Sequence, residues 1–423
     1  MIQSIRINDN IFLHYIPMEK LKTTTLGLFI HRAMSEEEAS KNALLASVLK
    51  RGCKLCKDGA SIAKYLQNLY GASFGSLIQK KGDDQVISFA MESISDKYAP
   101  NGEKLLDSLT DLLLSVVFEP VVINGGFDKD IVNQEKANLK DRINGLINDK
   151  REYAVYRCVS AMCENEPVGI YRYGSAEGVD KIDEVSLYEH YKKIITSSVI
   201  DIYICGDTDV ESIKNKISAY TDKMSFAKAE IACGKAVSQS GEIKKVKDNL
   251  DVTQGKLAIG FRTNIVSTDK DYYGLVVANS IFGSGAHSKL FNNVREKLSL
   301  AYYAASRLYK QNGLMVMDAG IEFENYQKAY DETLVQLENI KKGDITENEF
   351  NSSIKAIVNS LNSYYDDQNY MTDWYLSQRP NNTEISIDEM IEGIEKVTME
   401  DVKNAARKIQ IDTVYFLAGK EEN

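Results

Sequence analysis

Histidine is scarce in this chain. The 423 residues include only four histidines, at His14, His31, His190 and His287. No two of them are close enough in sequence for one helix to present two imidazoles to the same metal ion. We therefore expect each histidine to be an ordinary hydrogen-bonded residue, although His287, in a glycine-rich turn, could touch a substrate.

Long apolar runs, a leading signal and basic clusters are also missing. No stretch approaches the roughly 18 apolar residues of a membrane span. The first residues, MIQSIRINDNIFLHYIP, lack the basic segment and apolar core of a secretory signal, so we expect a cytoplasmic protein without membrane contact. The net charge is −10 and the lysines and arginines are scattered, which argues against nucleic acid as a partner.

The cysteines form no recognisable metal or redox motif. Cys53 and Cys56 make a CxxC pair, but a zinc ribbon needs a second pair, and the nearest candidate, Cys158 with Cys163, is distant and differently spaced. A thioredoxin-like site would follow a strand, whereas an apolar helical pattern precedes this pair. We expect all six cysteines to be reduced thiols.

Motifs for phosphate binding and for serine hydrolysis are absent too. The turn Gly283-Ser284-Gly285 lacks the Gly-Lys-Ser/Thr end of a P-loop, and no GxSxG occurs anywhere in the chain. The sequence therefore gives no nucleophile and no nucleotide site to which a reaction could be assigned.

What the chain does contain is a repeated pattern. Its 43% hydrophobic and 26% charged residues are typical of a globular protein, and its length predicts more than one domain. A buried strand, an apolar helix, a second strand and two longer helices follow one another twice, at nearly equal separations. The paired segments are 26–32 and 256–262, 42–52 and 274–283, 84–91 and 313–320, 104–117 and 326–340, and 127–149 and 346–367.

This order predicts an α+β fold made of two homologous α+β domains. Each domain should contain an antiparallel-rich sheet with helices packed on one face. We expect an N-terminal domain at 1–228, a small, polar and lysine-rich linker at 229–249, and a C-terminal domain at 250–423.

Arg295 and Tyr302 lie seven residues apart in the segment GSGAHSKLFNNVREKLSLAYYAAS. On a helix this step is about two turns, so both side chains could face the same point. A guanidinium and a phenolic hydroxyl together could hold a peptide carbonyl or a developing oxyanion. The alternative is a solvated charged face next to a tyrosine that only packs.

The same segment, together with the repeated layout, resembles the insulinase/pitrilysin family of zinc peptidases, particularly its processing-peptidase-like members. The shared signature is a glycine-rich turn, a Ser-x-Leu-Phe step, Arg-Glu-Lys and Leu-Ala-Tyr. The resemblance implies half of a clamshell chamber, and it implies that Arg295 and Tyr302 are the catalytic and substrate-binding pair that holds the substrate carbonyl at the zinc ion.

The zinc half departs from the family pattern. The family's His-x-x-Glu-His motif falls on Ala43, Ala46 and Ser47, so both histidine ligands and the general base are replaced. A later helix should carry two glutamates seven residues apart. The first matches Glu135, but the third zinc ligand falls on Arg142. Such a site cannot hold Zn²⁺, and the chain resembles the family's subunit that lacks the zinc motif but keeps the Arg–Tyr pair.

The resemblance implies a chain that is proteolytically silent alone and has no cofactor of its own. It would pair with a homologous subunit that carries the zinc, and the heterodimer would cleave an unfolded peptide held as an added β-strand. Two alternatives remain open: a scaffold or peptide-binding protein without catalysis, and a homodimer without a protease partner.

An aromatic group on the late helices has two possible roles. It comprises Tyr364, Tyr365, Tyr370, Trp374 and Tyr375. These rings could be core and interface packing, or they could form one wall of a peptide-binding chamber.

Overall fold

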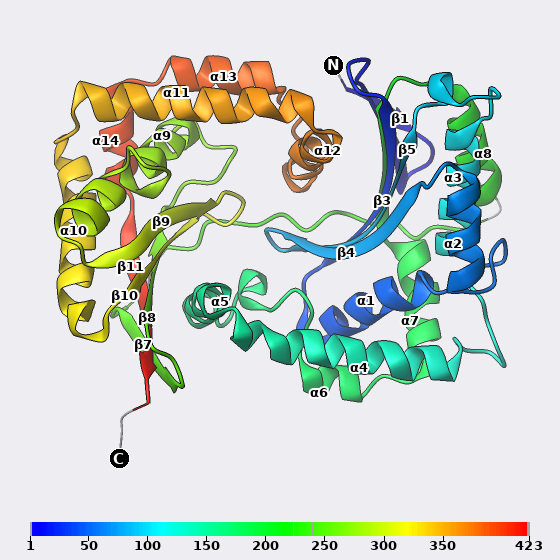
Figure 1. Cartoon of the computed structure of the whole chain (residues 1–423), viewed down its shortest axis with the longest axis horizontal. Coiled ribbons are helices and arrows are strands. Elements are labelled where there is room, and N and C mark those ends of the chain that lie inside the picture. Colours follow the sequence, from blue (N-terminus) through cyan, green and yellow to red (C-terminus); the bar gives the residue numbers. More distant parts are fainter. Residues whose placement is uncertain (1, 223, 239–240, 421–423) are drawn as a thin grey trace. The chain divides into compact units, whose positions relative to one another are not determined.

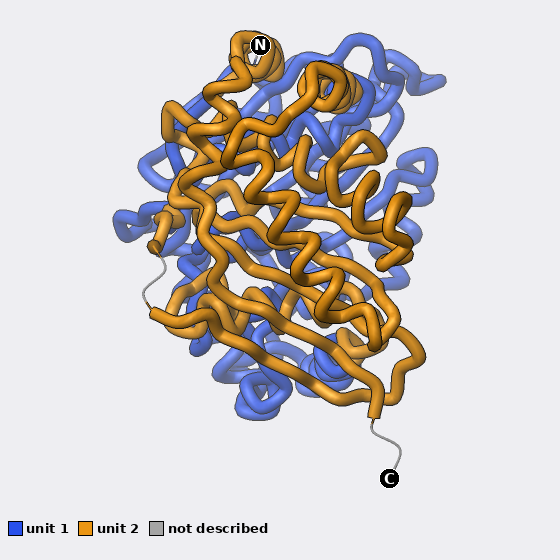
Figure 2. Tube along the Cα trace, turned by 90° about the vertical axis from the view of Figure 1, so that its left-hand side faces the viewer, with its two compact units in different colours: residues 1–144, 171–232, 364–384 blue, residues 145–170, 233–363, 385–423 orange. Residues whose placement is uncertain are grey.

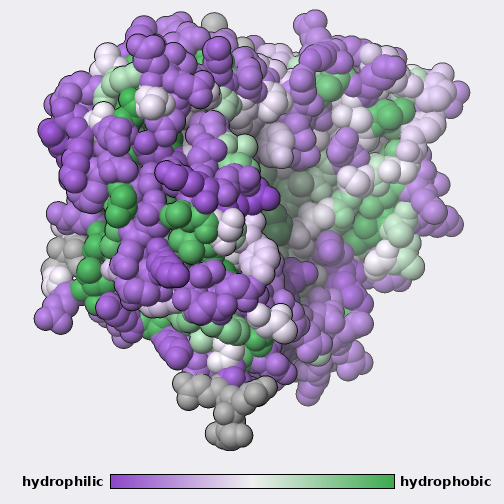
Figure 3. All heavy atoms as spheres, turned by 60° about the vertical axis from the view of Figure 1, so that its left-hand side comes forward, coloured by the Kyte–Doolittle hydropathy of each residue, from purple (hydrophilic) through white to green (hydrophobic). Residues whose placement is uncertain are grey.

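The computed structural model describes residues 2–222, 224–238 and 241–420. The chain divides into two compact units, each built from three separate stretches of sequence (Figure 2). Unit 1 comprises Met1–Asn144, Tyr171–Ala232 and Tyr364–Glu384, and unit 2 comprises Gly145–Ile170, Cys233–Ser363 and Ile385–Asn423. Within the described ranges, no helix is long and apolar enough to cross a membrane. Hydrophilic side chains predominate on the face drawn in Figure 3.

Unit 1 is organised around a six-stranded mixed sheet with the order β1-β2-β6-β3-β5-β4 (Figure 1). Neighbouring strands are antiparallel except for β2 and β6, which are parallel. The strands are β1 (Gln3–Arg6), β2 (Ile11–Pro17), β3 (Thr23–Ala33), β4 (Ser73–Lys81), β5 (Asp84–Ile94) and β6 (Val199–Gly206).

Unit 2 contains a five-stranded sheet with the order β7-β11-β8-β10-β9. Here β7 and β11 are parallel and the other neighbours are antiparallel. The strands are β7 (Lys244–Leu250), β8 (Gly255–Arg262), β9 (Ala301–Tyr309), β10 (Leu314–Ile321) and β11 (Gln410–Gly419). The stretch expected as a linker, 229–249, therefore ends in a strand of this sheet.

Five strands of the unit 1 sheet, all except β1, match the unit 2 sheet in order. The order β2-β6-β3-β5-β4 in unit 1 corresponds to β7-β11-β8-β10-β9 in unit 2, including the one parallel pair. The predicted α+β class and the repeated pattern are thus confirmed. Sequence patterning indicates the central strands β3, β5, β8 and β10, which are strongly apolar, but not the edge strands β4 and β9, which are more polar.

Most helices of each unit pack on one face of its sheet, as expected. The helices of unit 1 are α1 (Glu36–Leu49), α2 (Gly59–Asn68), α3 (Leu105–Phe118), α4 (Lys129–Gly145), α6 (Ala176–Asp180), α7 (Glu184–Ser197), α8 (Glu211–Thr221) and α12 (Gln368–Leu376). Those of unit 2 are α5 (Lys150–Met162), α9 (Tyr272–Gly283), α10 (Tyr326–Lys342), α11 (Glu347–Ser363), α13 (Ile387–Glu395) and α14 (Met399–Arg407).

Each sheet also carries one helix on its other face. In unit 2, α5 packs on β8, β10 and β11, where Val155 and Val159 meet Val316. In unit 1, α12 lies against β3 and β6. Short-range periodicity cannot predict these contacts, since α5 and α12 come from stretches far from their sheets in sequence.

The face of the unit 1 sheet on the α12 side contains a buried polar cluster. Its centre is Asp201, whose carboxylate accepts hydrogen bonds from His31 Nε2 at 3.1 Å and from Arg379 Nε at 2.6 Å. His14 Nε2 lies 3.2 Å from the same carboxylate, and His31 Nδ1 lies 2.7 Å from Asp84. Burial alone would lower the pKa of His31, but the two carboxylates outweigh it and raise the pKa to about 9.

This cluster attaches the α12 segment to the sheet through Arg379. Replacing Asp201 by Asn keeps the side-chain volume but leaves the partly buried Arg379 and the buried His31 without their shared counter-charge. We expect Asp201→Asn to lower the free energy of unfolding by about 3–5 kcal/mol, measured by urea denaturation. The exposed pair of Lys20 and Asp366 is the control, and Asp366→Asn should cost less than about 1 kcal/mol. Equal effects of the two substitutions would contradict the role given to Asp201.

Candidate functional site

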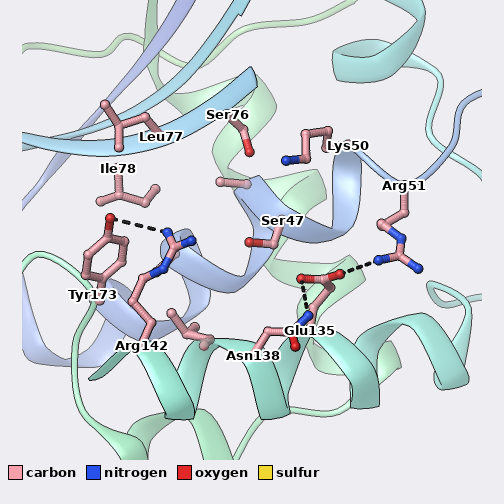
Figure 4. A pocket seen from close by; sticks show the side chains of 13 residues that line it. Ser47, Lys50, Arg51, Ser76, Leu77, Ile78, Glu135, Asn138, Arg142 and Tyr173 are labelled. Carbon is pink, nitrogen blue, oxygen red and sulfur yellow. Dashed lines mark hydrogen bonds and ion pairs between the residues drawn. The ribbon is translucent and has the colours of Figure 1, made fainter. Parts of the chain in front are cut away.

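The four positions that the sequence resemblance matches to zinc ligands and base, Ala43, Ala46, Ser47 and Arg142, lie around a single cavity of unit 1 with a volume of about 310 Å³ (Figure 4). Helices α1 and α4, strand β4 and the chain around Tyr173 form its walls. The lining residues are Ala43, Ala46, Ser47, Lys50, Arg51, Ser76, Leu77, Ile78, Glu135, Asn138, Leu139, Arg142 and Tyr173.

Helix α1 presents one of its faces to this cavity. Ala43, Ala46, Ser47 and Lys50 are spaced by three, four and seven residues, which places them on one side of a helix. The helix begins after Ser35, whose hydroxyl accepts a hydrogen bond from the first turn. This face offers two methyl groups, one hydroxyl and one ammonium group, so it contains no nitrogen or carboxylate ligand for a metal.

Helix α4 faces the cavity with the same periodicity. Glu135, Asn138 and Arg142 lie at steps of three and seven residues and point from α4 towards α1 (Figure 4). Glu135 Oε1 accepts a hydrogen bond from Arg51 Nη1 at 2.7 Å, and Asn138 donates to its other oxygen at 3.3 Å. The one carboxylate of the cavity is therefore already neutralised by a guanidinium group.

Tyr173 determines where Arg142 lies. The guanidinium of Arg142 lies 5.3 Å from the ring centroid of Tyr173 and donates to its hydroxyl at 3.4 Å. The neighbouring Gly174 has a φ of +72°, and a Cβ atom there would come within 2.1 Å of the Ser40 hydroxyl on α1. Glycine thus lets this segment approach α1 closely enough to hold Tyr173 against Arg142.

This donor set does not fit a zinc ion. Catalytic zinc needs three ligands drawn from histidine, cysteine and carboxylate side chains. The cavity has one carboxylate, Glu135, which is paired with Arg51, and it also contains Lys50 and Arg142, whose charges repel a divalent cation. Elsewhere in the described part of the chain, no group of three or more His, Cys, Asp or Glu side chains is placed to hold a metal.

The structure corrects the expectation that Arg295 and Tyr302 share one helix face. Arg295 lies on the helical segment η4 (Leu290–Lys297), which has π-type geometry, whereas Tyr302 lies on β9. The chain turns between them at Ser299, which has a φ of +51°. Their relative position is therefore set by this turn and not by helical periodicity.

Both side chains are nevertheless accessible. Tyr302 is 58% exposed, and its hydroxyl donates to the carboxylate of Glu322, which raises the pKa of the tyrosine. The side chain of Arg295 is 41% exposed and lies 4.7 Å from the ring centroid of Phe291. Tyr303, the next residue on β9, instead packs its half-buried ring 4.4 Å from the guanidinium of Arg151, since successive side chains of a strand point to opposite faces.

The histidines are hydrogen-bonded residues, as expected. His14 and His31 belong to the Asp201 cluster, and the buried His190 lies 2.7 Å from the side-chain oxygen of Asn42. His287 in the glycine-rich turn lies 3.1 Å from the Ser280 hydroxyl. The six cysteines are free thiols, and all except Cys233 are buried.

A second cavity of unit 1 involves the aromatic cluster. It measures about 450 Å³ and lies between α12 and strands β4 and β5. Tyr370, which is 55% exposed, lines it, and the ring of Tyr370 stacks on Tyr364 at 5.2 Å between centroids. The cluster therefore combines ring packing with a cavity wall, and whether that cavity holds a peptide stays a prediction.

Sequence reasoning missed several residues of the first cavity. Lys50, Ser76 and Tyr173 attracted no attention, because none belongs to a motif and β4 was not recognised as a strand. The seven-residue step from Ala43 to Lys50 on an apolar helix could have indicated that the lysine shares the face of the former ligand positions.

We expect the isolated chain to bind no stoichiometric zinc. Ser47→His alone should not restore binding, because one imidazole does not make a three-ligand site. Combining Ala43→His, Ala46→Glu, Ser47→His and Arg142→Glu restores every ligand and the base on the same two helix faces, and should give about one zinc per chain. Metal analysis after dialysis measures the zinc content of the unmodified protein and of the two variants. One tightly bound zinc in the unmodified protein would show that another site exists.

Comparison with known proteins agrees with this geometry. The family model described as "Peptidase M16 inactive domain" matches residues 181–357. The chain is 37% identical over 410 residues to the "Probable inactive metalloprotease YmfF" of Bacillus subtilis (strain 168), covering 96% of each chain.

Two solved structures share the fold. A conserved protein from Enterococcus faecalis V583 has a TM-score of 0.90 and 28% identity, with 100% of this chain and 99% of that one covered. A peptidase M16 inactive domain from Pseudomonas fluorescens has a TM-score of 0.78 and 18% identity, with 99% and 98% covered. With a relative this similar over nearly its whole length, the chain belongs to the M16, or insulinase-family, peptidase homologues.

Proposed function

We propose that the chain is a non-catalytic peptidase homologue that binds an extended peptide along β4. The observation that supports this most directly is the position of β4. It is the last strand of the six-stranded sheet, so its outer backbone groups face no other strand of that sheet. An exposed edge of this kind accepts a peptide as an additional strand.

The surroundings of β4 suit such a ligand. The first cavity lies on the helix-covered side of the sheet, next to α1 and α4, and the second lies on the α12 side. Both cavities are lined by Ser76 and Leu77 of β4. Since side chains of an added strand point alternately to the two faces, each cavity could receive every second side chain of the peptide.

Two further observations support binding without cleavage. The first cavity has neither a zinc ligand set nor the general base that the family's reaction needs. The similar protein of Bacillus subtilis is also described as a probable inactive metalloprotease. The open edge of β4 lies next to a cavity that lacks zinc ligands, and this combination is suited to a protein that holds or presents a peptide without cleaving it.

Binding as an added strand predicts a strict dependence on the peptide backbone. Two variants of the peptide are N-methylated at alternate residues, one at the odd positions and one at the even positions. In one variant the methyl groups replace the N–H groups that face β4, and in the other they replace those that face solvent. We expect one of the two N-methylated peptides to bind at least about tenfold more weakly and the other to bind about as well as the unmodified peptide. The reason is that only one set of N–H groups makes inter-strand hydrogen bonds. Fluorescence anisotropy with labelled peptides measures this. Equal weakening in both registers would contradict strand addition.

The second cavity gives a test with a matched control. Tyr370→Ala removes an exposed ring that lines the cavity, and we expect peptide affinity to fall on the order of tenfold. Tyr98 is similarly exposed, at 44%, but lies outside both cavities, so Tyr98→Ala should leave affinity unchanged. Thermal melting of both variants controls for folding. Unchanged affinity in Tyr370→Ala would exclude this cavity from the peptide site.

A second candidate function follows from the exposed Arg295 and Tyr302. In this proposal the chain is the processing-peptidase-like subunit that supplies this pair to a homologous partner carrying zinc and base, and the heterodimer cleaves the peptide. The accessible hydroxyl of Tyr302 supports it, although that hydroxyl must leave Glu322 to reach a substrate. A homodimer without a zinc-bearing partner would retain peptide binding alone.

The heterodimer proposal predicts distinct kinetic effects in a complex with a zinc-bearing homologue. Tyr302→Phe should lower turnover on the order of 10²-fold, the usual effect of removing one oxyanion donor. Arg295→Ala should act mainly on the apparent affinity for peptide. Tyr303→Phe is the control and should have little effect, because its ring faces the opposite side of β9. Sedimentation first establishes assembly. A strictly monomeric chain, or full turnover in Tyr302→Phe, would refute this candidate.

A further inference from the structure

The first cavity of unit 1 has an unbalanced positive charge. Three cationic side chains line it, Lys50, Arg51 and Arg142, but only one carboxylate does, that of Glu135. Glu135 is already paired with Arg51 at 2.7 Å. Among the described residues, neither Lys50 nor Arg142 forms an ion pair. The cavity that corresponds to the family's metal site therefore contains two positive side chains without a negative partner.

These groups converge on one space. Figure 4 shows the ammonium end of Lys50 extending towards Ser76 and the guanidinium of Arg142 lying beside Tyr173, with Ser47 between them. The hydroxyls of Ser47 and Ser76 have no hydrogen-bond partner in the part of the chain that the structure describes. Both hydroxyls can donate a hydrogen bond, as can the two cations, so these four groups can all donate to one acceptor.

Arg142 is held in position before any ligand arrives. The ring of Tyr173 is buried and contacts the guanidinium of Arg142 at 5.3 Å and that of Arg172 at 5.2 Å. Tyr173 is in turn kept close to α1 by the hydrogen bond between Ser175 N and the Ser40 hydroxyl, at 3.1 Å. A guanidinium with a fixed direction loses little conformational entropy when it binds a planar anion.

We propose that this cavity binds a carboxylate group of the peptide that lies along β4, with Arg142 and Lys50 as the charged donors. The inference rests on the proposed peptide-binding function and names the ligand group. Arginine pairs with carboxylates through two parallel hydrogen bonds, and lysine adds a point charge from the other side. The carboxylate is the C-terminus of the peptide or an Asp or Glu side chain.

The position of the cavity next to β4 favours this ligand. Ser76, Leu77 and Ile78 of β4 form one wall, so a peptide strand added to β4 passes the opening. One side chain or chain end directed to the helix-covered face can then reach Arg142. The site thus replaces metal-dependent cleavage with recognition of a negative charge at one position of the bound peptide.

The test measures affinities by fluorescence anisotropy for one peptide sequence in three forms. The forms have a free C-terminal carboxylate, a C-terminal amide, and an amide with one internal Glu, and none has another acidic residue. The intact chain should bind at least one of the two carboxylate forms about tenfold more tightly than the plain amide. If the form with the free C-terminus binds more tightly than the plain amide, the cavity recognises the chain end. If the form with the internal Glu does, the cavity recognises a side chain.

Charge-neutralising variants locate the effect. Arg142→Gln and Lys50→Gln should each remove most of the preference for the carboxylate form, measured as the ratio of its affinity to that of the amide form. Lys64→Gln on α2 is the matched control, because Lys64 is exposed and lies outside the cavity, and it should keep the full preference. All three positions are exposed, and thermal melting verifies that each variant is folded.

The outcomes separate this inference from the function on which it rests. Binding of all three peptide forms with equal affinity would overturn the carboxylate site but leave peptide binding intact. A carboxylate preference that survives in both Arg142→Gln and Lys50→Gln would also overturn it. Absence of binding to every form, including the amide, would overturn the proposed function and the inference together.

Discussion

Two helices, α1 and α4, present one face each to the same cavity, and this shared periodicity determines which of their side chains line it. Residues spaced by three, four and seven positions fall on the inner side of each helix whatever their chemistry. Ala43 and Ser47 of α1 and Arg142 of α4 therefore all line the same cavity. Changing the side chains on these faces changes the chemistry of the cavity without requiring a different fold.

The charge of the cavity follows from those replacements. A zinc site concentrates neutral imidazoles and carboxylates around a cation, whereas this cavity places Lys50, Arg51 and Arg142 around a single carboxylate. Burying cations without counter-charges is unfavourable, and the protein limits the cost by leaving Lys50 and Arg142 accessible to solvent. A solvent-accessible cationic cavity beside an open strand edge is suited to an anionic group on an extended ligand.

The two units have corresponding edge strands, but different side chains and cavities lie beside them. Strand β4 ends the sheet of unit 1, and β9 occupies the same place in the sheet of unit 2. Next to β4 lie two cavities, while β9 carries the exposed Tyr302 and follows the segment with Arg295. The same topological position thus lies beside two cavities in one unit and carries or adjoins the candidate Arg–Tyr pair in the other. This division is why binding and partner complementation can be tested with separate substitutions.

The sequence by itself determined the α+β class and the repeated order of elements, because these depend on local periodicity, and its residue identities left helix α1 without a histidine or carboxylate on the cavity face. The tertiary structure alone decided the rest. It placed Tyr173 against Arg142, since these residues are far apart in sequence and Gly174 brings their segments together. It also separated Arg295 from Tyr302 by a turn, because β9 gains its hydrogen bonds from β10, a partner that the periodicity of residues 295–302 does not reveal.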